Sequence, residues 1–277
     1  MKPSVQTVAV VLAILLVLPL LSSTARAGDE DACPIDARAI GQDVEALFRA
    51  PGDWDAGHWA AVGAIGALST GLVLKWDEAI YKQSVEAPGA FPYVVVHKLA
   101  WLGGWYGRND LVPIITFGSL AGGLAIAGAA RDDDRLTRTA GIVTEAYLFT
   151  AGITLALKLL AGRSRPYTGD GAKKWRFIGF HKRDTRSFPS GHTASAFSMA
   201  TVVTKRHSDW YVQLPAWTLA TGVAAQRIDS GAHWASDTLI GAVIGYSVSA
   251  FLTDRHSCAN PSAAANSPSY FTVGFDF

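Results

Sequence analysis

The sequence predicts an all-α protein. Its apolar segments are rich in Ala, Gly, Leu and Val. They are too long for strands, and they lack the alternation that is typical of a half-buried strand. Of the 277 residues, 49% are hydrophobic and 17% are charged, which is apolar for a soluble protein. We expect helices at about 58–75, 111–130, 139–161, 192–204, 214–226 and 237–253, with a weaker, aromatic candidate at 90–106.

The first 27 residues have the pattern of a signal peptide. Lys2 supplies a positive charge, and the uncharged apolar run Val8–Leu21 follows it. Ala25-Arg26-Ala27 then offers small residues where a signal peptidase reads them, so we expect cleavage before Gly28. The alternative is an uncleaved membrane anchor, although the apolar run is short for a span.

The rest of the chain divides into three expected parts: a polar N-terminal segment (28–56), a helical domain (57–258) and a tail (259–277). The tail ends in Tyr270–Phe277, whose alternation suggests a short strand. Export permits disulfides. The two cysteines, Cys33 and Cys258, flank the helical domain, and we expect them to be bonded, with two free thiols as the alternative.

Length decides which helices could cross a membrane, since a span needs about 20 apolar residues. The 111–130 and 139–161 segments qualify, whereas 192–204 and 214–226 are short, as in the core of a soluble bundle. The sequence therefore leaves open whether the helices span. We expect a protein of the bacterial cell envelope, in the periplasm and in contact with the membrane or embedded in it.

The formal net charge of +1 argues against nucleic acid as a partner, so any anion must be recognised by a local cluster. The connection 162–190 is the longest one inside the domain and is rich in basic residues. Long connections in compact domains are usually functional or disordered.

Three short runs around this connection suit phosphate chemistry. Lys158 and Arg165 bring cations to the end of an apolar helix, and Arg presents a planar fork that matches phosphate oxygens. Taken alone, Lys158 could snorkel to water, and Arg163 and Arg165 could be surface charges.

The second run, Pro189-Ser190-Gly191-His192, opens a helix. Ser190 is a good N-cap, Gly191 permits close approach of a ligand, and the helix start attracts anions. His192 would stand at the mouth of that anion site; the alternative is an ordinary capped helix with a partly buried His.

The third run ends in His233 and Asp237, which share one face if residues 232–237 are helical. A carboxylate that holds one imidazole nitrogen makes the other a better nucleophile. The same pair could be half of a metal site, but no third ligand is evident and the neighbouring cations would repel a metal. We therefore expect no metal and no other cofactor.

Together the runs resemble the signature of the type 2 phosphatidic acid phosphatase and vanadium haloperoxidase superfamily. That signature reads Lys, six residues, Arg-Pro; then Pro-Ser-Gly-His; then Ser-Arg, five residues, His, three residues, Asp. The chain departs from it at Gln226, which replaces the Ser before the last Arg, and we expect this to tune the site without abolishing activity. The matching residues are Lys158, Arg165, Pro166, Pro189, Ser190, Gly191, His192, Arg227, His233 and Asp237.

The resemblance implies a bundle of about six core helices with the active site at one end. It implies that His233 attacks phosphorus and forms a phosphohistidine, that Asp237 orients it, and that His192 protonates the leaving oxygen. By the same resemblance, the phosphate would be held by Lys158, Arg165, Ser190, Gly191 and Arg227.

We therefore predict an exported, metal-independent phosphatase, similar to acid phosphatases, that cleaves a phosphate monoester or diphosphate. Its expected partner is a phosphorylated small molecule or, in view of the apolar helices, a lipid. Two alternatives remain: a vanadate-dependent haloperoxidase, and a non-catalytic envelope protein with a relict anion site. The sequence names neither the substrate nor the oligomeric state.

Overall fold

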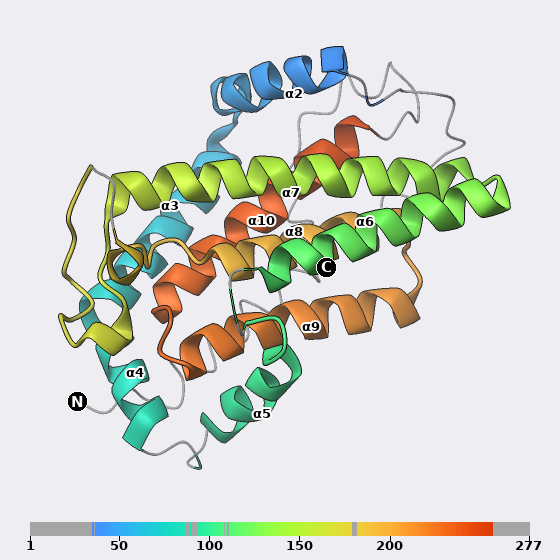
Figure 1. Cartoon of the computed structure of the whole chain (residues 1–277). Coiled ribbons are helices and arrows are strands. Elements are labelled where there is room, and N and C mark those ends of the chain that lie inside the picture. The colour runs from blue at the N-terminus through green and yellow to red at the C-terminus, as the bar shows by residue number, and fades with distance from the viewer. Residues whose placement is uncertain are drawn as a thin grey trace, which may run out of the picture.

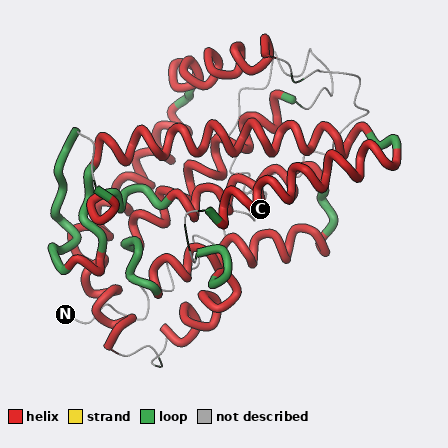
Figure 2. The backbone as a smooth tube through the Cα atoms, viewed as in Figure 1, coloured by secondary structure: helices red, strands yellow, loops and turns green. Residues whose placement is uncertain are grey.

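The computed structural model describes residues 35, 37–86, 89, 93–107, 109, 111–178 and 182–256. The predicted signal peptide, the C-terminal strand and both cysteines lie outside these residues. Within them the helices are joined by loops and there are no strands, which confirms the all-α prediction (Figure 2). The α-helices are α2 (Ala37–Arg49), α3 (Ala56–Gly71), α4 (Asp77–Glu86), α5 (Tyr93–Gly103), α6 (Val112–Arg131), α7 (Asp134–Ala161), α8 (Gly191–Arg206), α9 (Trp210–Asp229) and α10 (Ala235–Arg255).

The segments expected to be helical are helices, with two differences. The first expected helix continues beyond residue 75: a π-helical turn, Leu72–Trp76, joins α3 directly to α4. In the polar N-terminal segment, for which we expected no element, α2 forms, and the turn-like Ala50–Asp53 is a short 3-10 helix.

The longest helix, α7, starts and stops at local signals. The carboxylate of Asp133 accepts a hydrogen bond from the backbone N–H of Leu136, as an N-cap does. At the other end Gly162 has a left-handed conformation (φ 56°), and its backbone N–H donates a hydrogen bond to the carbonyl of Lys158. At about 1.5 Å per residue, the 28 residues of α7 run about 40 Å.

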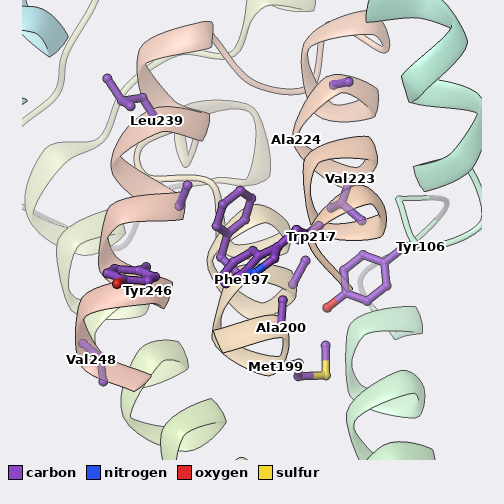
Figure 3. Close-up of a cluster of buried hydrophobic side chains, with 14 of the residues drawn as sticks. Tyr106, Phe197, Met199, Ala200, Trp217, Val223, Ala224, Leu239, Tyr246 and Val248 are labelled. Atoms are coloured by element: carbon purple, nitrogen blue, oxygen red, sulfur yellow. The ribbon is translucent and has the colours of Figure 1, made fainter. Parts of the chain in front are cut away.

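The core lies among α8, α9 and α10 (Figure 3). The rings of Phe197 and Trp217 lie 5.9 Å apart, and Tyr246 joins them from α10. In Figure 1, α6 and α7 run side by side along one face, with α8 and α10 behind α7 and α5 against α9. The remaining core positions are mostly small, which lets the helices approach closely.

In the part of the chain that the structure describes, four helical stretches are long and apolar enough to cross a membrane: Ala56–Glu86, Val112–Arg131, Asp134–Thr168 and Ala235–Arg255. They differ in burial. The apolar windows of the first two are mostly exposed, whereas that of α10 is mostly buried in the bundle. Exposed apolar side chains on the outer helices include Ile114, Ile115, Ile126, Leu148 and Leu155. Many exposed apolar side chains on long apolar helices are typical of a protein that contacts a membrane.

Candidate active site

The chain direction brings four helix ends together. Since α7, α8, α9 and α10 alternate in direction, the last turns of α7 and α9 lie beside the first turns of α8 and α10 (Figure 1). We call this the cationic end, because it holds Lys158, Arg165, His192, Arg227 and His233. All three sequence runs that suggested phosphate chemistry meet here.

Lys158 lies over the start of α8. Its Nζ donates to the backbone carbonyls of Arg186 (3.1 Å) and Pro189, in the connection that leads to α8. A Cβ placed on Gly191 would lie 3.7 Å from the Cε of Lys158. The ammonium is therefore held close to the N-terminal end of α8, and both the ammonium and the helix start attract an anion.

Ser190 is the N-cap of α8, as predicted. Its hydroxyl accepts from the backbone N–H of Thr193 (3.4 Å) and lies 2.9 Å from the Thr193 hydroxyl. The backbone N–H of Ser190 donates to the carbonyl of Asp237 (3.0 Å), which ties α8 to α10. Gly241 permits this approach, because a Cβ there would lie 2.5 Å from the carbonyl oxygen of Ser190.

His233 and Asp237 are neighbours, but they do not share a helix face. The helix begins only at Ala235, so the condition that residues 232–237 be helical is not met. His233 stands in the preceding turn, where Gly231 has a φ of 63° and the His233 N–H donates to the carbonyl of Arg227. The Nδ1 of His233 lies 3.7 Å from Oδ2 of Asp237. That is ion-pair range, longer than a hydrogen bond, and catalytic hydrogen bonds often tighten only around a substrate.

His233 is buried, and this sets its charge. Burial lowers the pKa of His233 well below its ordinary value, and the positive charges of Arg165 and Lys158 lower it further, against the opposing effect of Asp237. The imidazole is therefore neutral at neutral pH, which leaves one ring nitrogen with a lone pair for attack.

Three donors fix the carboxylate of Asp237. Its Oδ2 accepts from the hydroxyl of Ser187 and from the backbone N–H of Trp234 (3.0 Å). Its Oδ1 accepts from the guanidinium of Arg163 (2.6 Å). Each carboxylate oxygen is thus satisfied before His233 is considered, so the carboxylate is rigidly placed beside the imidazole.

Arg163 is not a surface charge, and that reading of the sequence is wrong. Its side chain is fully buried between the rings of Trp175 and Trp234, and its guanidinium bridges Asp237 and Asp77 (2.8 Å). Asp77 is the first residue of α4, directly after the π-helical turn, and it also accepts from the backbone N–H and hydroxyl of Ser236.

The remaining predicted residues stand around His233. Arg165 is half-buried and donates from Nε to the carbonyl of Arg183 (3.0 Å). Arg227 is buried and donates to the carbonyl of Gly107 (2.7 Å) and to the hydroxyl of Ser230 (3.2 Å). The side chain of Gln226 lies against Gly107, the residue whose carbonyl accepts the hydrogen bond from Arg227. Gln226 is the position at which the chain departs from the family pattern.

His192 is half-buried at the first turn of α8, next to the anion-attracting helix start. Its Nε2 lies 3.2 Å from the carbonyl oxygen of Asn109, and its ring meets that of Tyr106 edge-on at 6.1 Å. The hydroxyl of Tyr106 in turn lies 2.7 Å from that of Ser195. These contacts fix the orientation of the His192 imidazole beside the start of α8.

Similarity to known proteins agrees with this arrangement. Residues 139–257 match the model of the PAP2 superfamily, and the domain that they form belongs to that superfamily, the type 2 phosphatidic acid phosphatases. This stretch contains all of the predicted catalytic and phosphate-binding residues, whereas Asp77 and the two cysteines lie outside it.

Two curated relatives are similar to parts of the chain. A lipid A 1-phosphatase of Porphyromonas gingivalis is 44% identical over 62 residues, which is 21% of this chain and 14% of the relative. A lipid A 4'-phosphatase of Helicobacter pylori is 33% identical over 113 residues, which is 39% of this chain and 53% of the relative. The chain thus spans about half, or less, of the length of these relatives. No solved structure matches the chain at a significant level.

Proposed function

We propose that this protein is an envelope phosphatase that removes a phosphate group from a membrane lipid, through a phosphohistidine on His233. One observation carries the proposal: a buried, neutral imidazole lies beside a fixed carboxylate and among cations that would hold a phosphate. The names of the two relatives point to lipid A, a phosphorylated glycolipid, as the substrate class. The exposed apolar helices suit a substrate that stays in a membrane.

The first chemical step is an in-line displacement. The cations Lys158, Arg165 and Arg227, together with the N–H groups at the start of α8, neutralise the phosphoryl oxygens. The ring nitrogen of His233 that faces away from Asp237 attacks phosphorus, and the bond from phosphorus to the leaving oxygen breaks. Protonated His192 gives its proton to that oxygen. Most of the rate enhancement in such transfers comes from positioning and charge stabilisation.

The second step regenerates the enzyme. Neutral His192 takes a proton from a water molecule, whose oxygen attacks the phosphorus of the phosphohistidine. The bond from nitrogen to phosphorus breaks, inorganic phosphate leaves, and both histidines return to their starting states. Asp237 stabilises the positive charge that His233 carries between the two steps, and Arg163 and Asp77 keep that carboxylate in place.

The test uses the purified full-length protein in lipid micelles. We expect phosphate release from bis-phosphorylated lipid A, with mass spectrometry identifying which phosphate is lost. Phosphatidate, a prenyl diphosphate and an aryl phosphate serve as competing substrates. Initial rates should be unchanged by EDTA and strongly lowered by vanadate, which mimics the five-coordinate transition state.

Three results would overturn the proposal. The first is no release from any phosphorylated lipid. The second is a rate that EDTA abolishes and a divalent ion restores. The third is oxidation of bromide by peroxide once vanadate is bound, without phosphatase activity, because that would assign the chain to the haloperoxidase branch.

A further inference from the structure

A second buried polar cluster lies at the opposite end of the bundle. It consists of Asp43 on α2, Glu145 on α7 and His256 just after α10, and we call it the Asp43 cluster. Their exposed fractions are 2%, 3% and 8%. Glu145 stands 13 residues before Lys158 on α7, which is about 20 Å along the helix axis at 1.5 Å per residue. The Asp43 cluster is therefore not part of the cationic end.

The three side chains converge on one point. The Nε2 of His256 lies 2.7 Å from Oε2 of Glu145 and 3.1 Å from Oδ2 of Asp43. One atom from each residue lies within 4.8 Å of the other two. Ligands of a transition metal stand about 2.0–2.2 Å from the ion, so atoms about 3 Å apart can share one.

Two carboxylate oxygens of the cluster accept no hydrogen bond from the other residues of the cluster. An Nε2 proton directed at Glu145 does not reach Asp43, although Asp43 is within ion-pair distance. Among the described residues, Oδ2 of Asp43 and Oε1 of Glu145 are buried and have no hydrogen-bond partner. Buried polar atoms are nearly always paired, and an exception indicates a water molecule or an ion.

The balance of charge in the Asp43 cluster also favours a bound cation. The cluster holds two carboxylates, and Arg255 neutralises one of them by donating to Oδ1 of Asp43. A proton on His256 would balance the second charge and form an ion pair with Oδ2 of Asp43, yet it would leave Oε1 of Glu145 without a hydrogen bond. A divalent cation would use the lone pair of His256 and one oxygen from each acid at once.

We propose that Asp43, Glu145 and His256 bind a divalent first-row transition metal, with Zn²⁺ the best match. One imidazole nitrogen and two carboxylate oxygens suit such an ion, whereas Mg²⁺ and Ca²⁺ prefer oxygen ligands alone. The ion would tie α2 to α7 and α10. Asp43 is the one buried residue among the described side chains of α2, so the metal would be a main anchor for that helix.

The experiment measures metal binding without reference to activity. Tag-free full-length protein is stripped with a chelator, and Zn²⁺ is then titrated by calorimetry, with metal content measured after gel filtration. We expect about one Zn²⁺ per chain, a higher Tm with Zn²⁺, and no such shift with Mg²⁺ or Ca²⁺. Wild-type protein that binds no Zn²⁺ would overturn the proposal.

Near-isosteric variants identify the ligands. Asp43→Asn and Glu145→Gln should each weaken Zn²⁺ binding at least tenfold and remove the Tm shift. Asp254→Asn, at the same end but paired with Lys205, and His97→Gln, an exposed imidazole, should bind as wild type does. Circular dichroism and phosphatase turnover report whether each variant folds.

A further variant excludes thiol ligands. Cys33→Ser combined with Cys258→Ser should keep its Zn²⁺, because the proposed donors do not include sulfur. Undiminished binding by Asp43→Asn and Glu145→Gln, or loss of Zn²⁺ in the double cysteine variant, would contradict the assigned ligands.

Discussion

The two ends of the bundle both bury carboxylates, but they satisfy them differently. At the cationic end, all four oxygens of Asp77 and Asp237 accept hydrogen bonds, from Arg163, Ser187, Trp234 and Ser236. At the Asp43 cluster, one oxygen of Asp43 and one of Glu145 have no partner among the described residues.

The difference indicates what each end lacks. At the cationic end the hydrogen bonds of both acids are already satisfied, and the positive charges of Lys158 and Arg165 act on His233, so an anion would complete it. At the Asp43 cluster the unsatisfied atoms are negative, so a cation would complete it. The same residue types thus favour opposite ligands, because burial makes the local balance of donors and acceptors decisive.

The largest effect that we predict falls on the cationic end alone. His233→Ala should reduce turnover to background, since no other nucleophile of suitable geometry is evident there. Phosphohistidine is hydrolysed in acid, so the reaction should be quenched at alkaline pH. The labelled phosphate should then be located by mass spectrometry. His97→Gln is the matched control. More than a small fraction of wild-type rate in His233→Ala would refute the role.

Removing the general acid should have a smaller effect that depends on the substrate. His192→Ala should slow alkyl or lipid phosphates by about 10²–10⁴, the usual contribution of one general acid. Aryl phosphates, whose leaving oxygen needs no proton, should lose far less. The ratio of the two rates measures the role, and equal losses for both substrates would argue against it.

A still smaller effect should follow from the support behind Asp237. Asp77→Asn removes the charge that holds Arg163 while keeping the shape of the side chain. We expect kcat to fall by up to about 10²-fold, the scale of a misplacement near 1 Å, with little change in KM because the phosphate-holding cations remain. Asp254→Asn is the control. A lower Tm with unchanged kcat would mean that Asp77 is only structural.

The sequence predicted most of the helices because each is a long apolar segment bounded by charge or by Gly and Pro. It did not predict α2 (Ala37–Arg49), which carries many polar residues and whose buried side chain is Asp43. The side chain of Asp43 lies against Glu145 on α7 and Arg255 on α10, more than 100 residues away. Local patterns do not carry such information.

The motif residues could also be predicted, because the spacing between them can be recognised in the sequence. The role of Arg163 could not be predicted, since its partner Asp77 is 86 residues away and lies outside every motif. A charged residue beside a known cation also looks like a surface residue until its burial is known. The relation of His233 to Asp237 was predicted for a helix, and a turn with a left-handed glycine produces it instead.

The smallest effect on turnover should come from the two cysteines, which flank the helical domain in the sequence. Ile35, two residues after Cys33, packs against Gly141, and His256, two residues before Cys258, contacts Glu145. Ile35 and His256 therefore lie against neighbouring turns of α7, and we still expect the two cysteines, which lie outside the described residues, to be bonded. On the chain-entropy model such a long loop contributes about 4–5 kcal/mol to stability.

Cys33→Ser combined with Cys258→Ser should thus lower the Tm while leaving kcat at 25 °C unchanged, because the cationic end does not depend on the bridge. Non-reducing mass spectrometry of periplasmic material should find the two residues linked. Two free thiols there, or a loss of kcat as large as the loss caused by Asp77→Asn, would show that the two ends are not independent. A bridge also needs both cysteines on the oxidising side of the membrane, so finding it would exclude any topology that places one of them in the cytoplasm.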